Sequence, residues 1–306
     1  MTLPIGRFAP TPSGALHFGS LVAALASYCD IRSQQGRWLL RIEDVDTPRV
    51  VAGASDQILR DLNAFGFEWD GEVLYQSTRF EHYRHYLEQL LQQGDSYACQ
   101  CSRRSLREQG VSCGPLGQIY PGNCRDRKLE RKGRSLRLST AMAAARPKEV
   151  HFQDRVYGDV SMNLEAEVGD FVLQRADLVY AYHLAVVVDD EWQGVNQIVR
   201  GADLLENTCL HLHLQQRLGF SPPAYLHLPL VRNAAGIKLS KQTGARPLDY
   251  DKASKLLLAA LQHLGQQAPP ELENESPAEI LQWSCDHWDP SLITARRSAL
   301  AQAHDD

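Results

Sequence analysis

Long hydrophobic runs are absent from this sequence of 306 residues, because charged or polar residues interrupt every apolar stretch before it could span a bilayer. The first residues lack a basic region followed by an apolar stretch, so no secretory signal is predicted there. We therefore expect a cytoplasmic protein with no membrane partner. Glycine (21) and proline (15) are too few for a collagen-like or low-complexity chain, and 43% hydrophobic residues can bury a sizeable core.

An excess of positive charge is also lacking, since 32 Lys and Arg stand against 37 Asp and Glu, a net charge of -5. This balance argues against a protein that coats nucleic acid through bulk charge. A local basic stretch nevertheless runs from residue 125 to residue 137. Asp126 and Glu130 within it favour a solvated face, whereas its density of Lys and Arg favours contact with RNA phosphates, and the sequence leaves both interpretations open.

The chain has seven cysteines, and in a reducing compartment they do not predict a disulfide framework. Cys99, Cys101 and Cys124 could give three thiolates to a tetrahedral zinc ion, with a fourth ligand from the loop between them. By ligand chemistry alone, Cys113 is the candidate for that position. Ordinary unliganded thiols are the alternative.

The first part of the chain alternates between strand-like and helix-like segments. Strands are predicted at Ile5 to Phe8 and Arg37 to Ile42, and helices at Gly19 to Ile31 and Ser55 to Phe65. This order predicts an α/β fold with a parallel sheet covered by helices, in which ligands bind beyond the carboxyl ends of the strands. The loop from Ala9 to His17 would then face the ligand.

The later segments suggest a sheet interrupted by an insertion. A helix is predicted at Arg79 to Gln93, strands at Phe171 to Leu173, Tyr182 to Val188 and Tyr225 to Val231, and another helix at Asp203 to Leu218. We divide the chain into a first catalytic half (1–94), a zinc-containing insertion (95–169), a second catalytic half (170–235), and a lysine-bearing loop with C-terminal helices (236–306).

Two short motifs have the chemistry of phosphate binding. His17 and Gly19 stand where a strand and a turn-rich loop feed into a helix, so backbone N–H groups and the helix dipole could hold a phosphate. Lys238 and Lys241 flank Ser240 in a polar loop after the last predicted strand, from which they could reach a triphosphate. Taken singly, a helix cap and an exposed basic turn are the simpler interpretations.

Four motifs occurring in order resemble the catalytic core of the class I glutamyl-tRNA synthetases. They are Arg7-Phe8-Ala9-Pro10-Thr11-Pro12-Ser13-Gly14 with Leu16-His17-Phe18-Gly19, then Arg41-Ile42-Glu43-Asp44-Val45-Asp46, Val199-Arg200-Gly201-Ala202-Asp203 and Lys238-Leu239-Ser240-Lys241. The likeness runs from Ile5 to Gln242. One departure is Ser20, which stands where the family usually has the second His of its His-x-Gly-His signature.

The resemblance implies a class I Rossmann-type sheet with a zinc-containing insertion and a small C-terminal helical region. It implies that His17, Gly19 and Lys241 bind ATP, which arrives with Mg²⁺, and that His17, Lys238 and Lys241 act in catalysis. The implied glutamate site comprises Arg7, Phe8, Ala9, Pro10, Thr11, Glu43, Tyr182 and Arg200. The two arginines would take the carboxylates in an order left open, and Glu43 with Tyr182 the ammonium group. Tyr120 is implied as the fourth ligand of one structural Zn²⁺, beside Cys99, Cys101 and Cys124.

The length of the chain points to the short relatives of this family, because only the residues after Asp251 are left for a large anticodon-binding region. Those relatives form glutamyl-adenylate without tRNA and transfer glutamate to queuosine at the first anticodon position of tRNA(Asp). We expect the same of this chain, acting as a monomer. Two alternatives are a truncated or discriminating glutamyl-tRNA synthetase that charges a tRNA 3′ end, and a non-catalytic, synthetase-derived regulator that binds ATP or RNA.

Overall fold

A five-stranded parallel arrangement forms the centre of the computed structural model, which describes residues 2–141, 149–232, 246–295 and 299–300. β1 (Ile5–Phe8) pairs with β2 (Arg37–Ile42), and β2 with β3 (Leu74–Tyr75). β11 (Gln197–Gly201) pairs with β12 (Ala224–Leu228). The two groups of strands meet where the backbone N–H of Asn196, which precedes β11, donates to Ile5 O of β1 at 3.0 Å. The spatial order is therefore β3, β2, β1, β11, β12, as a doubly wound fold requires.

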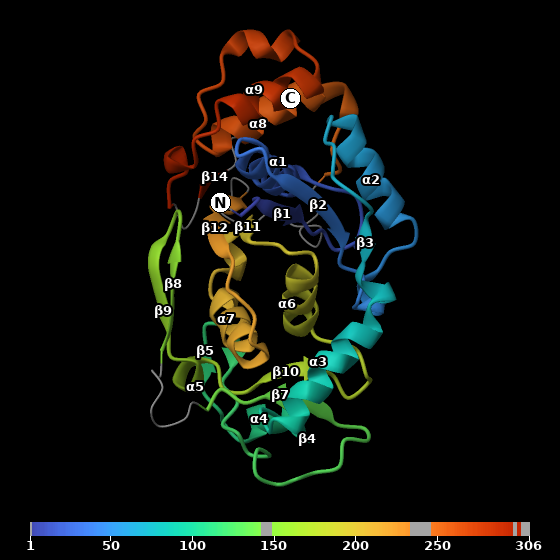
Figure 1. The fold of residues 1–306 in the computed structure, drawn as a ribbon, viewed down its shortest axis with the longest axis vertical. Coiled ribbons are helices and arrows are strands. Elements are labelled where there is room, and N and C mark those ends of the chain that lie inside the picture. Colours follow the sequence, from blue (N-terminus) through green and yellow to red (C-terminus); the bar gives the residue numbers. More distant parts are fainter. Residues whose placement is uncertain (1, 142–148, 233–245, 296–298, 301–306) are drawn as a thin grey trace.

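Helix α1 (Phe18–Arg32) covers one face of these strands, and α8 (Ala253–His263) and α9 (Pro277–Asp286) cover α1 (Figure 1). The main hydrophobic core lies between these layers and includes Trp38 and Leu257. Helix α2 (Ala54–Ala64) flanks the same core. The predicted strands β1 and β2 and the first three predicted helices are confirmed to within one residue at each end, because their apolar spacing coincides with what they bury.

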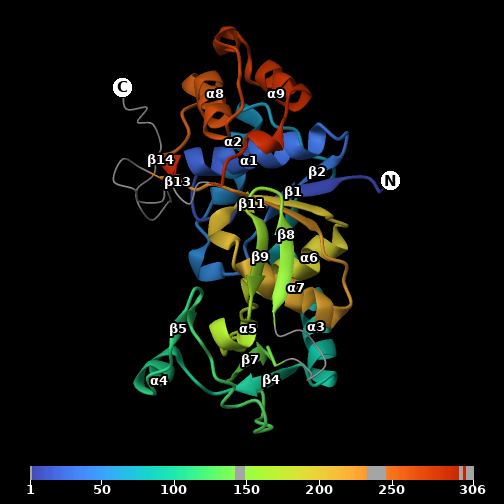
Figure 2. The ribbon, with the colours of Figure 1, turned by 90° about the vertical axis from the view of Figure 1, so that its left-hand side faces the viewer.

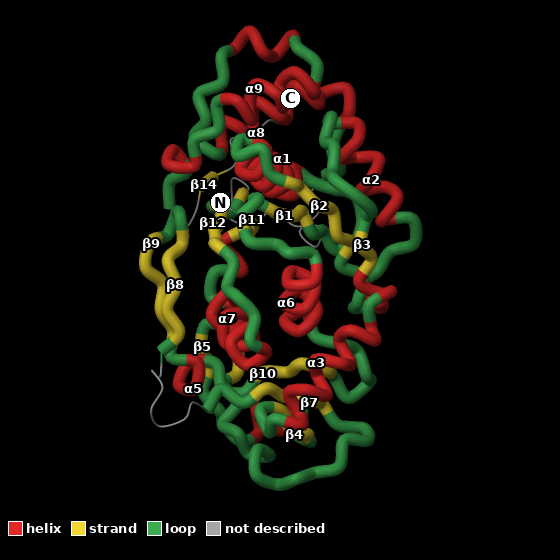
Figure 3. Tube along the Cα trace, viewed as in Figure 1, coloured by secondary structure: helices red, strands yellow, loops and turns green. Residues whose placement is uncertain are grey.

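The far end of the molecule is built around an antiparallel sheet in the order β10 (Phe171–Gln174), β7 (Ser135–Leu138), β4 (Ser96–Cys99). Figure 3 shows this region as mostly loop, and α4 (Arg103–Glu108) lies at its edge in Figure 2. The remaining short elements are α5 (Leu164–Glu167), β5 (Cys113–Gly114), β6 (Gly117–Gln118), β13 (Val231–Arg232) and β14 (Ala299–Leu300). The four-part division of the chain stays a prediction, and β10 and β7 share one sheet across its boundary at residue 169.

The hairpin of β8 (Val150–Asp154) and β9 (Gly158–Met162) connects the two ends of the molecule. It runs lengthwise from the parallel strands toward α5 (Figure 2), and Asp154 pairs with Tyr225 of β12 in parallel register. A segment within the predicted insertion thus joins the central sheet.

One predicted strand is wrong. Residues 182–188 begin α6 (Tyr182–Trp192), which packs against α3 (Phe80–Gln92) and α7 (Asn207–Leu218). The valine run from Val186 to Val188 favours a strand by propensity, but burial between two helices overrides that preference. The predicted strand from Tyr225 to Val231 is split into β12 and β13, with Pro229 between them, because proline cannot donate to a sheet ladder.

No helix in the described parts of the chain combines the length and the apolar character that a membrane crossing requires.

Candidate active site and metal centre

The loop between β1 and α1 opens onto a cavity of about 450 Å³ at the carboxyl ends of the parallel strands. Its lining includes Thr11, His17, Gly19, Gly201, Asp203 and Val231. The cavity therefore joins the first and third sequence motifs, which lie far apart in the chain. A cavity at this edge of an α/β sheet, beside a helix N-terminus, is a suitable place for a phosphate-bearing ligand.

His17 is the N-cap residue of α1, and its Nδ1 accepts a hydrogen bond from Ser20 N at 3.3 Å. The capping interpretation of His17 is thus correct, and it coexists with a place on the cavity wall. A Cβ on Gly19 would lie 3.2 Å from the His17 ring, so glycine allows the imidazole to sit over the start of the helix.

The two catalytic lysines of the sequence prediction, Lys238 and Lys241, lie outside the described residues. The described chain reaches Arg232, and Val231 directly before it lines the cavity. Phe8, Pro10 and Thr11 also line the cavity.

A buried cluster of charges lies next to the end of β1. Arg7 Nε donates to Asp190 Oδ1 at 2.9 Å, and Arg41 Nη1 lies 2.8 Å from the same oxygen. Arg41 Nη2 also donates to Glu43 Oε1 at 3.4 Å. Burial alone would raise the pKa of Asp190, but Arg41 and Arg7 hold that pKa below its ordinary value. The Glu43 carboxyl differs, since burial raises its pKa despite the same two arginines.

Arg200 approaches this cluster from β11. Its Nη1 donates to Tyr182 Oη at 3.3 Å, and its Nη2 to Thr208 Oγ1 at 2.7 Å. Burial raises the pKa of Tyr182 to about 12, and the charges of Arg200, Glu43 and Arg7 also act on that hydroxyl. The structure therefore gathers the predicted residues Arg7, Glu43, Tyr182 and Arg200 around one point; their roles toward a substrate stay predictions.

Ala9 and Pro10 belong to the loop that crosses this region. Pro10 O accepts a hydrogen bond from Glu43 N at 3.0 Å, which ties the end of the first motif to the second. Ala9 lies between Phe8 and Pro10 and is half-buried.

Two charged residues of this cluster were not predicted as site residues. Arg41 is fully buried within the apolar run of β2. A charged residue in such a run rarely becomes buried without a partner, so the sequence already indicated that Arg41 would be paired. Asp190 is the second, and it has Arg7 and Arg41 as partners. The neighbouring Asp189 accepts hydrogen bonds from the Arg79 guanidinium, the Tyr83 hydroxyl and the Gln76 amide. Because residues 182–188 were predicted as a strand and not as the start of a helix, the sequence did not predict that Asp190 would face Arg7 and Arg41.

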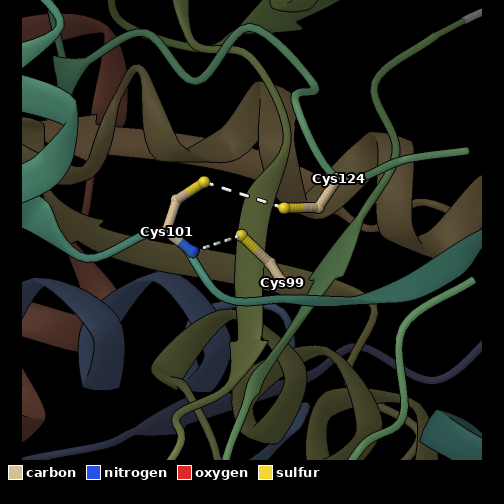
Figure 4. Close-up of side chains that lie close together, drawn as sticks. All are labelled: Cys99, Cys101 and Cys124. Carbon is tan, nitrogen blue, oxygen red and sulfur yellow. Dashed lines mark hydrogen bonds between the residues drawn. The ribbon is translucent and has the colours of Figure 1, made fainter. Parts of the chain in front are cut away.

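A second site lies in the insertion, where three cysteine sulfurs gather within 4.8 Å of one another (Figure 4). Cys99 ends β4, Cys101 follows it, and Cys124 comes from a loop. Cys101 Sγ lies 3.7 Å from Cys124 Sγ. Two sulfurs bound to one tetrahedral zinc at about 2.3 Å would be roughly 3.8 Å apart, so the cluster fits the ion.

Tyr120 completes the ring of donors. Its hydroxyl lies 3.2 Å from Cys99 Sγ and 3.7 Å from Cys101 Sγ, and it accepts a hydrogen bond from Cys124 N at 3.1 Å. Cys113, the alternative fourth ligand, is exposed on β5 and is not part of the described cluster. The geometry therefore favours Tyr120 over Cys113.

Comparison with known proteins agrees with this architecture. Residues 5–271 match the family described as "tRNA synthetases class I (E and Q), catalytic domain". A solved structure of a glutamate tRNA ligase from Elizabethkingia meningosepticum, in complex with its amino acid, has the same fold with a TM-score of 0.80. It is 24% identical, and the match covers 99% of this chain and 68% of that one. The fold and the family match define a class I tRNA synthetase catalytic domain, and hence an ATP-dependent ligase.

Relatives with higher sequence identity place the chain in a smaller family within this class. A "Glutamyl-Q tRNA(Asp) synthetase" of Pseudomonas entomophila (strain L48) is 52% identical over 299 residues, which are 98% of this chain and 97% of the relative. A protein of the same description from Dechloromonas aromatica (strain RCB) is 52% identical over 285 residues, 92% and 93% of the two chains. This chain belongs to the family of these glutamyl-Q tRNA(Asp) synthetases.

Proposed function

We propose that this protein activates glutamate with ATP and transfers it to queuosine at the first anticodon position of tRNA(Asp). The observation that carries the first half is the placement of two buried arginines: Arg200 donates to the Tyr182 hydroxyl at 3.3 Å, and the charge of Arg7 acts on the same hydroxyl. Each arginine directly precedes a residue that lines the cavity. Guanidinium groups hold carboxylates in bidentate geometry, and a dicarboxylic amino acid calls for two such groups.

The charge balance of the cluster supports an anionic amino acid. Three guanidinium groups, those of Arg7, Arg41 and Arg200, lie near two carboxylates, those of Glu43 and Asp190. One positive charge is left over, which matches the single negative charge of glutamate. Glu43 would receive the ammonium group, whose arrival would favour the ionised carboxylate that burial now disfavours.

ATP would occupy the cavity between the β1–α1 loop and β11, with its phosphates toward His17 and Gly19. A carboxylate oxygen of glutamate attacks the α-phosphorus, the bond to the β-phosphate bridging oxygen breaks, and pyrophosphate leaves. His17, Lys238 and Lys241 would stabilise the charge that moves onto the phosphates. Mg²⁺ would arrive bound to the ATP phosphates and neutralise part of their charge.

In the second step a hydroxyl of the queuosine cyclopentenediol attacks the carbonyl carbon of the adenylate, and AMP leaves with the electron pair. Support for this acceptor comes from the description of the relatives that share half of this sequence over nearly its whole length. No general base is required, because the acyl group is already activated. Such a substrate is consistent with action in the cytoplasm, and the protein would act as a monomer.

We also propose that Cys99, Cys101, Tyr120 and Cys124 hold one structural Zn²⁺. A closed site with four protein ligands leaves no open position for a substrate, so the ion would fasten loops of the insertion together.

The test is incubation with labelled glutamate, ATP and bulk tRNA from cells with and without queuosine, followed by nuclease digestion. Label on a queuosine nucleoside, absent with queuosine-free tRNA, is the expected result. The matched control is tRNA trimmed of its 3′ adenosine, which should be labelled as well as intact tRNA. Label that depends on the 3′ adenosine would instead support a glutamyl-tRNA synthetase, and absence of glutamate-dependent ATP–pyrophosphate exchange would support a non-catalytic binding protein.

A further inference from the structure

Arg200 differs from the other arginines of the site, because its partners within the described parts of the chain are all uncharged. Arg7 and Arg41 both reach Asp190, whereas no carboxylate among the described residues lies within 4.0 Å of the Arg200 guanidinium. Its donors face the residues His227, Thr208, Tyr182, His211 and the carbonyl oxygen of Leu204. Arg200 is 6% exposed, so its charge is largely shielded from water and has no direct counter-ion among the residues that the structure describes. A guanidinium in that condition is prepared to receive an anionic ligand.

The orientation of Arg200 depends on His227 of β12. Arg200 Nε donates to His227 Nε2 at 3.1 Å, and the other ring nitrogen, Nδ1, lies 2.7 Å from Asp154 Oδ2. An ionised carboxylate can only accept a hydrogen bond, so the ring proton must be on Nδ1. Nε2 then presents its lone pair to the arginine. The other tautomer would place two N–H groups against each other and displace Arg200.

Asp154 is itself fixed at the tip of the β8–β9 hairpin. Its Oδ1 accepts hydrogen bonds from Val156 N and Tyr157 N, both at 2.9 Å, and its Oδ2 accepts one from His227 N at 3.1 Å. The neighbouring Arg155 binds both carboxylate oxygens of Asp30 on α1, at 2.6 Å and 2.9 Å. The hairpin in Figure 2 is therefore held at the central sheet by two contacts: Asp154 binds His227 of β12, and Arg155 binds Asp30 of α1.

We propose that Asp154 and His227 are positioning residues for the amino-acid site. Asp154 selects the Nδ1–H tautomer of His227, and His227 in turn aligns the Arg200 guanidinium for a substrate carboxylate. The identity of that carboxylate as one of glutamate's rests on the proposed function; the alignment of Arg200 does not. Because Arg200 is oriented before the substrate arrives, less reorganisation is needed on binding.

The electrostatics agree with this arrangement. Burial lowers the pKa of His227, and the Arg200 charge lowers it further against the opposing effect of Asp154, so the ring is neutral at pH 7. Burial would raise the pKa of Asp154, but the hydrogen bond with His227 and two backbone N–H groups keeps it below its ordinary value. The pair is thus a carboxylate and a neutral imidazole.

The kinetic test measures ATP–pyrophosphate exchange at varied glutamate and varied ATP. His227→Leu removes the acceptor for Arg200 Nε and should raise the KM for glutamate by about tenfold or more, with the KM for ATP nearly unchanged. Asp154→Asn should have the same effect, because its amide no longer dictates the tautomer. In His227→Gln a single amide supplies one donor and one acceptor, so the KM for glutamate should stay close to the wild-type value.

His213→Gln is the matched control. His213 is also a buried histidine, but on α7, where its Nε2 lies 2.8 Å from Ser139 O and it does not contact Arg200. This variant should lose stability without a change in the glutamate KM. If His227→Leu or Asp154→Asn folds and keeps a wild-type glutamate KM, the proposal is overturned.

A second measurement does not depend on the substrate. The nitrogen-15 spectrum of the histidine side chains, assigned with His227→Gln, should show the Nδ1–H tautomer in the wild type and its loss in Asp154→Asn. An Nε2–H tautomer in the wild type would overturn the positioning role whatever the substrate is. A wild type that shows the Nδ1–H tautomer but no glutamate-dependent exchange would support the Asp154–His227 arrangement and refute the proposed function.

Discussion

Arg7 Nε donates to Asp190 Oδ1 at 2.9 Å across 183 positions of sequence. The same oxygen lies 2.8 Å from Arg41 Nη1, so one carboxylate on α6 holds guanidinium groups from β1 and β2. All three side chains are nearly inaccessible to solvent. Asp190 thereby fixes the strand ends relative to the helix that carries Tyr182.

Asp190→Asn should therefore destabilise the protein and weaken glutamate binding together. Removing one partner of a buried ion pair typically costs about 3 to 5 kcal/mol, because the remaining charge is left uncompensated. We expect a lower unfolding free energy in urea and a glutamate KM raised by about tenfold or more. The control is Glu81→Gln, which breaks an exposed pair with Arg84 and should cost less than about 1 kcal/mol. Equal effects of the two variants would contradict the assignment.

Gly19→Ala tests the start of α1. The added Cβ would lie 3.2 Å from the His17 ring and should push that ring away from its capping position. We expect the KM for ATP to rise several-fold while the KM for glutamate changes little, as measured by ATP–pyrophosphate exchange. Gly94→Ala is the comparison, since a Cβ there meets no heavy atom of the described chain within 4 Å and its positive φ of 78° brings only local strain. An unchanged KM for ATP in Gly19→Ala would show that the position of the His17 ring does not contribute to ATP binding.

The zinc prediction distinguishes two cysteines, Cys99 and Cys113. Cys99→Ser should abolish stoichiometric zinc and lower the melting temperature, because metal-binding energy is also folding energy for such a site. Cys113→Ser should keep the metal, since Cys113 is exposed and stands apart from the described cluster. Elemental analysis of the purified variants measures both. Zinc retained at full occupancy in Cys99→Ser, or lost in Cys113→Ser, would show that the ligand set is wrong.

The free energy of unfolding should decrease in mild acid, because the unfolded chain binds a proton at His213 more readily than the folded protein does. Burial lowers the pKa of His213 to about 4, and its buried Nδ1 has no hydrogen-bond partner among the described residues. The unfolded chain binds this proton near pH 6.5 and the folded chain near pH 4, so stability is lost as pH falls across that interval. The loss through this group is about 3 kcal/mol. Urea titrations at several pH values should show a shallower decline for His213→Gln, and identical slopes would contradict the prediction.

The basic stretch from residue 125 to residue 137 can be tested by charge reversal. Arg131 and Lys132 are exposed, although Arg131 also pairs with Glu88. If this face meets RNA, the variant with both residues changed to Glu should transfer glutamate to tRNA more slowly, with a loss that shrinks at high salt. The exchange reaction should stay at the wild-type rate. Lys255→Glu, on α8, is the matched control, and an equal loss of transfer in it would argue against a specific RNA contact.

Local elements could be predicted where a short segment decides its own structure. The bounds of β1 and β2 follow from the apolar residues and the turns that border them. The prediction failed at Tyr182 to Val188, where strand propensity and helical packing point to different structures and the packing of α6 on α3 and α7 prevails. The cysteine cluster was also predictable, because ligand type and spacing carry most of the information about a zinc site.

By itself the sequence determined the family of this protein, because four motifs stand in a fixed order along the chain, and it determined which residue types can meet a phosphate, a carboxylate or a zinc ion. Only the tertiary structure decided that Asp190 joins Arg7 to Arg41, and that Asp154 reaches Arg200 through His227. The physical reason is that hydrogen bonds and ion pairs act over a few ångströms. Which side chains come that close depends on how helices and strands from distant parts of the chain pack together.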